Sequence, residues 1–90
     1  MALFAIMAPL EDPDLAKELA RLFPGDHIRL GTGQWIVSYA GTTPKELSDS
    51  LGISDARTGL GVVVRIAGYY GRANPEIWEW MAARLQGSPG

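Results

Sequence analysis

Three times in this chain a residue that caps helices stands directly before a proline: Asp12-Pro13, Thr43-Pro44 and Asn74-Pro75. Proline is favoured at the first position of a helix, where its missing N–H would have no partner anyway. The oxygens of Asp, Thr and Asn accept hydrogen bonds from the free N–H groups of the first turn. The three pairs therefore predict three helix starts, and they restrict the fold more than any other feature of the sequence.

The residues that follow each pair have helical spacing. Apolar side chains recur at helical intervals over residues 13–23, 44–51 and 75–86, so helices are predicted there. Thr43 and Glu46 form a capping box, and Gly52 followed by Ile53 is typical of a turn that ends a helix. In the third helix Trp80 falls off the apolar stripe, which makes it a candidate for an interface.

Four strand patterns lie between the helices, over residues 2–8, 27–30, 34–39 and 60–67. The order is typical of an α+β, ferredoxin-like βαββαβ fold, a four-stranded antiparallel sheet, here with an added C-terminal helix. Because the first and fourth strands are the most apolar, we expect them to be the two central ones. Leu19 and Ile66 are then expected to be buried between the first helix and these strands. Residues 1–86 should form one domain, with residues 87–90 as a flexible tail.

Right-handed crossovers place the first two helices on one face of such a sheet, which leaves the second face to be covered by something else. We expect the strand 27–30 to turn Ile28 and Leu30 toward the helices and Arg29 away from them. By the same reasoning Arg65 lies on the second face, among apolar neighbours. A face of this kind is typical of an association site, covered either by the third helix or by a second copy of the chain.

Residues 68–81, GYYGRANPEIWEWM, gather aromatic rings, a guanidinium group and a helix N-terminus. These are residue types that binding sites favour. The candidate binding side chains are Tyr69, Tyr70, Arg72 and Asn74. One interpretation is an anion or nucleotide site, in which Arg72 meets a phosphate while a tyrosine stacks. The other is structural, with Arg72 paired to Glu76 and the tyrosines packed on the sheet.

Charge and composition exclude several classes of function. The formal net charge is −2, and no run of Lys or Arg supplies the basic stripe that holds nucleic acid, so nucleic acid is not expected as a partner. There is no cysteine, which excludes disulfides and thiolate metal sites and fits a cytoplasmic location. Residues 1–10 are too short for a membrane span and lack a basic leader, so neither a membrane nor a secretory role is expected.

Three carboxylates follow the first strand: Glu11, Asp12 and Asp14. Clustered carboxylates can hold Mg²⁺, which would be the cofactor of a metal-dependent enzyme. The structural alternative is that Asp12 caps the first helix while the others flank its positive end. His27 is the only histidine and has no cysteine partner, and no motif for Ser-His-Asp catalysis is present.

The layout resembles that of small bacterial proteins. It has a short apolar first strand, a third strand that starts Gln34-Trp35-Ile36-Val37, a short helix after Thr43-Pro44 and an aromatic-rich end. In these features the chain is similar to the SinR-type hypothetical proteins, relatives of VapD and of the smaller CRISPR spacer-acquisition protein. The resemblance implies a ferredoxin-like homodimer and, in some members, a metal-dependent nuclease. Nuclease-type members carry an aspartate at the end of the first strand, where this chain has Met7-Ala8-Pro9-Leu10.

Two functional hypotheses follow from the sequence. The first is a non-catalytic homodimeric binding module, which uses the second sheet face and the segment Gly68–Met81 to hold a partner protein or a small anionic ligand. Its candidate residues are those of the aromatic segment together with Arg29, Arg65 and Trp80. The alternative is a metal-dependent nuclease or nucleotide-processing enzyme of the spacer-acquisition-like class, which would use Glu11, Asp12 or Asp14. The absence of a catalytic constellation favours the first.

Overall fold

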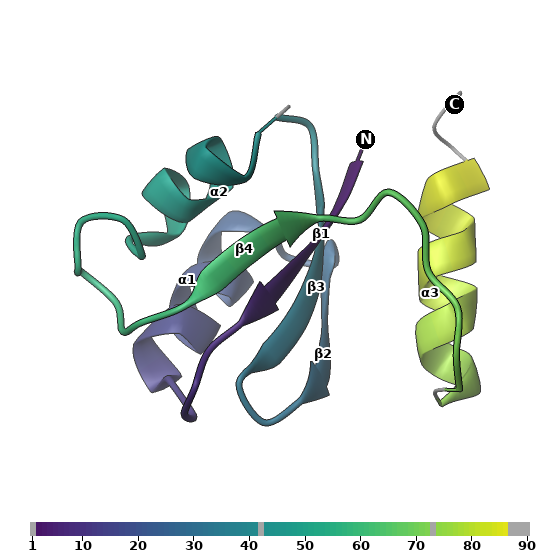
Figure 1. Ribbon diagram of the computed structural model, residues 1–90, viewed down its shortest axis with the longest axis horizontal. Coiled ribbons are helices and arrows are strands. Elements are labelled where there is room, and N and C mark those ends of the chain that lie inside the picture. The colour runs from purple at the N-terminus through teal and green to yellow at the C-terminus, as the bar shows by residue number, and fades with distance from the viewer. Residues whose placement is uncertain (1, 42, 73, 87–90) are drawn as a thin grey trace.

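The computed structural model describes residues 2–41, 43–72 and 74–86. The expected tail, residues 87–90, lies outside the described residues. Within them the chain forms an α+β fold with a four-stranded antiparallel sheet and three helices (Figure 1). The elements are, in chain order, β1 (Ala2–Met7), α1 (Pro13–Leu22), β2 (His27–Gly31), β3 (Gln34–Tyr39), α2 (Pro44–Leu51), β4 (Val62–Arg65) and α3 (Pro75–Gln86).

All three predicted helix starts are confirmed. The side-chain oxygens of Asp12, Thr43 and Asn74 accept hydrogen bonds of 3.0 to 3.2 Å from N–H groups of the first helical turns. α2 ends as expected at Gly52, whose φ of +83° is a left-handed conformation that glycine adopts without strain. None of the helices in the described residues is long and apolar enough to cross a membrane.

The strand order is β2-β3-β1-β4, so β1 and β3 are central and β4 is an edge strand. The expectation that the first and fourth strands occupy the centre was therefore wrong. β4 pairs with β1 alone, and it is shorter than predicted. The β2–β3 hairpin turns through Gly33, where φ is +69° and a Cβ atom would lie 2.6 Å from the Ala8 carbonyl oxygen.

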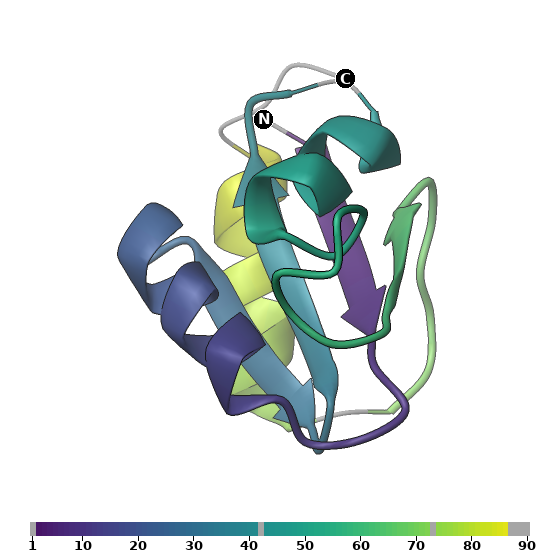
Figure 2. The same ribbon diagram turned by 90° about the vertical axis from the view of Figure 1, so that its left-hand side faces the viewer.

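One face of the sheet, here called the crossover face, carries α1 and α2, whereas α3 lies on the opposite, second face. Figure 2 shows α1 and α2 in front of the sheet and α3 behind it. The core under α1 and α2 is fully buried and consists of Phe4, Ile6, Leu15, Leu19, Val37, Leu47 and Leu51. Leu19 is 0 % exposed, as expected.

A second, smaller core lies under α3. Its buried members are Leu3, Ile36, Ile77 and Met81. Ile28 pairs with Ile36 in the register of β2 and β3 and packs against this core, so its side chain points away from α1 and α2. Ile66 packs against the same core and not against the first helix, contrary to the prediction.

The strand faces expected for β2 and β4 are consequently reversed. Arg29 lies opposite Trp35, on the crossover face, and Arg65 lies opposite Phe4, on the same face. The physical reason is that two apolar cores exist, one on each side of the sheet. The apolar set of a half-buried strand can face either core, and in β2 it faces the core under α3.

Candidate functional site

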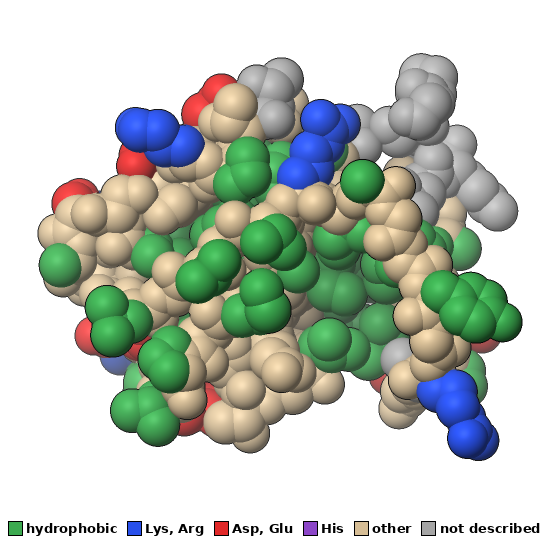
Figure 3. All heavy atoms as spheres, in the orientation of Figure 1, with side chains coloured by type: hydrophobic (Ala, Val, Ile, Leu, Met, Phe, Trp, Pro, Cys, Tyr) green, Lys and Arg blue, Asp and Glu red, His purple; other side chains and the backbone are tan. Residues whose placement is uncertain are grey.

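Helix α3 covers only part of the second face, and the remainder, here called the open half, is mostly apolar, with the exposed Gln34 opposite Met7. Its exposed side chains are Met7, Leu30, Val62 and Val64, which are 46, 45, 58 and 38 % exposed. Figure 3 shows apolar side chains gathered in the middle of the view, over β4 and its neighbours. A single exposed leucine or valine needs no explanation, but a contiguous set on one sheet face marks an interaction site.

Pairing between β1 and β4 produces this cluster. Met7 lies opposite Val62, and Ala5 lies opposite Val64, with all four side chains on the second face. Because the Ile66 N–H donates to the Leu3 carbonyl at 2.9 Å, Val62 and Val64 occupy the hydrogen-bonded pairs with β1. The backbone groups of Val63 and Arg65 therefore point outward along an unpaired strand edge that borders the open half.

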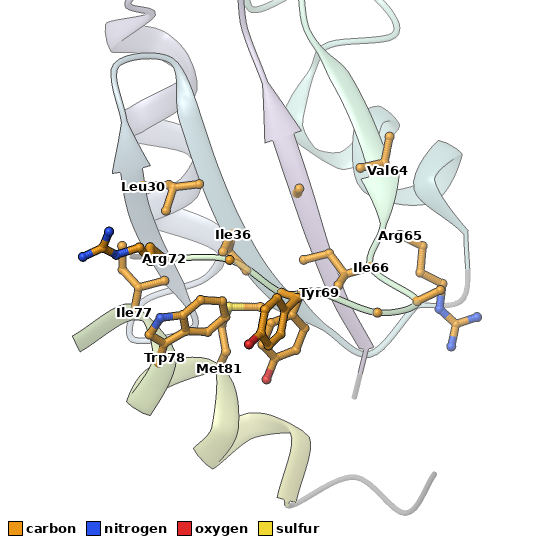
Figure 4. A pocket seen from close by; sticks show the side chains of 15 residues that line it. Leu30, Ile36, Val64, Arg65, Ile66, Tyr69, Arg72, Ile77, Trp78 and Met81 are labelled. Carbon is orange, nitrogen blue, oxygen red and sulfur yellow. The ribbon is translucent and has the colours of Figure 1, made fainter. Parts of the chain in front are cut away.

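A pocket of about 520 Å³ lies between the sheet, the segment after β4 and α3, and shares Leu30 and Val64 with the open half. Figure 4 shows Leu30, Ile36 and Ile66 on the sheet side and Ile77, Trp78 and Met81 on the α3 side. The other lining residues are Ala5, Val64, Arg65, Ala67, Gly68, Tyr69, Tyr70, Gly71 and Arg72. Its walls are thus almost entirely apolar, as is usual for small-molecule sites.

The aromatic segment divides into two parts. Tyr69 stacks on Trp78, with ring centroids 5.3 Å apart and an interplanar angle of 19°, and the pair forms one wall of the pocket. Tyr70, in contrast, is fully exposed at the rim. Asn74 caps α3 through its side-chain oxygen and does not line the pocket. Of the three, Tyr69 is the best placed to contact a ligand.

Arg72 and Arg65 also line the pocket and stand at its opposite ends (Figure 4). Within the described residues neither makes a hydrogen bond or an ion pair through its side chain. The other four arginines pair with carboxylates, in Arg21–Glu18, Arg29–Glu11, Arg57–Asp55 and Arg84–Asp26. The pair between Arg72 and Glu76 that the structural interpretation predicts does not form, so none of the described residues holds the guanidinium of Arg72 in an ion pair or hydrogen bond.

The structure places two predicted site residues elsewhere. The guanidinium of Arg29 lies 5.6 Å from the ring centroid of Trp35 and pairs with Glu11 at 2.7 Å, on the side away from the pocket. Trp80 is half-buried beneath the guanidinium of Arg84, which lies 4.1 Å from its ring centroid. Neither side chain joins Tyr69 and Arg72.

Two of the three carboxylates after β1, those of Asp12 and Glu11, have structural partners. Asp12 caps α1 with one oxygen, and its other oxygen accepts the Gly59 N–H at 2.7 Å, which ties the loop before β4 to the start of α1. Glu11 is held by Arg29, and Asp14 is exposed. Among the described residues no three His, Cys, Asp or Glu side chains converge in a way that could hold a metal ion.

The remaining surface charges are mostly paired on the α1 and α2 side. Side-chain hydrogen bonds from Arg21, Lys45 and Arg57 lower the pKa values of Glu18, Asp49 and Asp55 respectively from their ordinary values. These pairs join neighbours along the chain and are exposed, so each contributes little to stability. They leave the apolar second face as the distinctive surface of the molecule.

Met7, Val62, Val64 and Trp78 were not predicted as site residues. For the two valines the signal in the sequence was the strong apolar character of residues 62–64, which we attributed to a central strand. Once β4 is at the edge, the same apolar character indicates an interaction surface. Comparisons of the chain with protein-family models, with curated proteins and with solved structures found no match. Function is therefore inferred from the geometry of the open half and of the pocket.

Proposed function

We propose that this protein is a non-catalytic, homodimeric binding module. In this proposal the open half of the second sheet face binds a second copy of the chain, and the pocket beside it holds a ligand. The observation that carries the proposal is the exposed apolar set of Met7, Val62 and Val64, which are neighbours on the paired strands β1 and β4, together with Leu30 on the same face. A cytoplasmic location, proposed with it, is supported by the absence of cysteine.

We also propose that the architecture is a variant of the ferredoxin-like fold. The element order through β4 supports this, because β1-α1-β2 and β3-α2-β4 are two split β-α-β units whose strands interleave in the sheet, and both crossover helices cover one face. α3 is an addition to that plan, and it occupies part of the second face. The part it leaves uncovered is where the second copy would bind.

A second copy suits the open half for two physical reasons. Its apolar side chains carry no charge of either sign, so an identical surface can face it without repulsion. The unpaired edge of β4 borders the same surface, and such an edge must be covered or protected if the chain is not to aggregate. A twofold dimer is the commonest assembly that covers identical surfaces together.

The area that a stable interface must bury indicates which residues around the open half also belong to the interface. A stable interface buries roughly 800 Å² on each partner, which is more than four side chains supply. Leu60, before β4, and Tyr70, after it, are both largely exposed and apolar, and we expect them to extend the interface.

The nuclease alternative receives no support from the geometry of the carboxylates. Both oxygens of Asp12 accept backbone hydrogen bonds, and Glu11 is neutralised by Arg29. A catalytic metal would have to displace these contacts. Asp12 and Glu11 thus have structural roles that explain their presence.

The mass of the protein in solution tests the proposal. Sedimentation over a range of micromolar concentrations should give twice the chain mass of 9.7 kDa, with dissociation to the single chain on dilution. The binding free energy comes chiefly from apolar burial, so the dimer should persist at high salt. A mass of one chain throughout the micromolar range would contradict the proposal.

A further inference from the structure

The charged residues that line the pocket are all cationic. Of its fifteen lining residues, eleven have apolar or aromatic side chains, two are glycines and the remaining two are Arg65 and Arg72. Among the residues that the structure describes, no acidic side chain lines it. These two arginines are also the ones that form no ion pair within the described residues, whereas the other four each face a carboxylate.

The side chains of Arg65 and Arg72 point in different directions relative to the pocket. Arg65 lies opposite Phe4 in the register, so its side chain leaves β4 on the crossover face and only skirts the pocket. Arg72 comes from the segment that closes the pocket, and Figure 4 places it beside Leu30 and Ile77 at one end. Its long apolar stem can contact the pocket while the guanidinium stays at the rim, in water.

We propose that the pocket binds a small amphipathic anion, with an apolar body inside and a carboxylate or similar group at the rim beside Arg72. The body would lie between the aliphatic floor of Ile36 and Ile66 and the stacked wall of Tyr69 and Trp78. The volume of about 520 Å³ lies within the range of small-molecule sites. Buried apolar area supplies the binding energy, and the charge-assisted hydrogen bond from Arg72 selects an anion.

The inference rests on the binding role proposed above, but the pocket is formed within one chain. The ligand proposal can therefore be wrong while the dimer proposal is right, and the mass of the protein in solution distinguishes these two outcomes. The probes are octanoate, octan-1-ol and octylammonium, which share an eight-carbon chain and differ in the charge of the head group.

Calorimetric titration of the full chain should show saturable binding of octanoate. Octan-1-ol should bind several-fold more weakly, and octylammonium more weakly still, because Arg72 repels it. Tryptophan emission should change on binding, since Trp78 lines the pocket. Equal affinity for octanoate and octan-1-ol would overturn the assignment of an anion, and the absence of saturable octanoate binding would overturn the pocket itself.

Two matched variants test the role of Arg72. Arg72→Gln should weaken octanoate binding about tenfold, the order expected for one charge-assisted hydrogen bond, and leave octan-1-ol binding unchanged. Arg65→Gln makes the same charge change beside the same pocket and should alter octanoate affinity less than about threefold, as expected for a screened charge at a distance. Thermal melts confirm that both variants fold. Equal losses in the two variants, or none in Arg72→Gln, would overturn the proposed position of the head group.

Discussion

Replacing Leu19 with alanine should lower the free energy of unfolding by about 2–4 kcal/mol, a large share of the stability of a domain this small. Leu19 is 0 % exposed and belongs to the core that α1 and α2 form with the sheet. Its truncation leaves a cavity that fixed strands on one side and a second helix on the other cannot easily fill. Urea denaturation, followed at one protein concentration, measures the loss.

Ile66→Ala is the matched comparison, because it also truncates an aliphatic side chain packed on the sheet. Ile66 is only half-buried and packs on the second face, beside the pocket, where neighbouring chain can relax. We expect it to cost less than half as much as Leu19→Ala, on the order of 1 kcal/mol. Equal losses of unfolding free energy would contradict the description of a fully buried core under α1 and α2 and a smaller core, beside the pocket, under α3.

Val62→Glu should separate the dimer into single chains. Val62 is the most exposed valine of β4, so one copy of the chain should tolerate the carboxylate with little loss of stability. In the dimer the same carboxylate would be removed from water without a cation to pair with it. The cost of an unpaired charge in an interface is about 2–5 kcal/mol, which raises the Kd by at least roughly 30-fold.

Leu22→Glu provides the control for this substitution. Leu22 is an exposed apolar residue of α1, on the crossover-face side of the molecule, and the change adds the same charge. Light scattering, with both variants at the same concentration in the micromolar range, should therefore give the single-chain mass for Val62→Glu and the parent mass for Leu22→Glu. A dimer that survives Val62→Glu would place the interface elsewhere.

The helices could be predicted from the sequence because their signals are local. A capping oxygen, a proline and the first-turn N–H groups lie within four residues of each other, so Asp12, Thr43 and Asn74 specify helix starts without reference to the rest of the fold. The same holds for the turn at Gly52. Element order and strand number follow from these signals and from the apolar segments between them.

The positions and faces of the strands could not be predicted in the same way, because they depend on partners far along the chain. The valines of β4 have the composition of a central strand, yet β4 is at the edge. In β2 the apolar Ile28 alternates with polar neighbours, and this alternation does not show toward which face of the sheet the isoleucine side chain points. Only the register with Ile36, and the presence of α3 over that residue, decides the direction.

The candidate site was predicted in part. Tyr69 and Arg72 were identified as possible ligand contacts, and both line the pocket; Arg65 lines it as well, but its side chain turns to the other face. Arg29 was separated from the site by contacts with Trp35 and Glu11, which lie in other segments of the chain, whereas Trp80 contacts Arg84 one turn along the same helix. The walls formed by Ile36, Ile66 and Trp78 required knowledge of which strands lie under α3.

The central claim is that the open half of the second face is buried between two copies of the chain. Relaxation of side-chain methyl groups by a soluble gadolinium chelate tests it residue by residue. In a single chain Val62 and Met7, at 58 and 46 % exposure, should be relaxed more strongly than Leu22 at 36 %. If the protein is a dimer at micromolar concentration, this order is reversed: the methyl groups of Val62 and Met7 are protected from the chelate, and those of Leu22 are relaxed more strongly. If Val62 is relaxed most strongly, in the order of single-chain exposure, the open half faces solvent and the claim is contradicted.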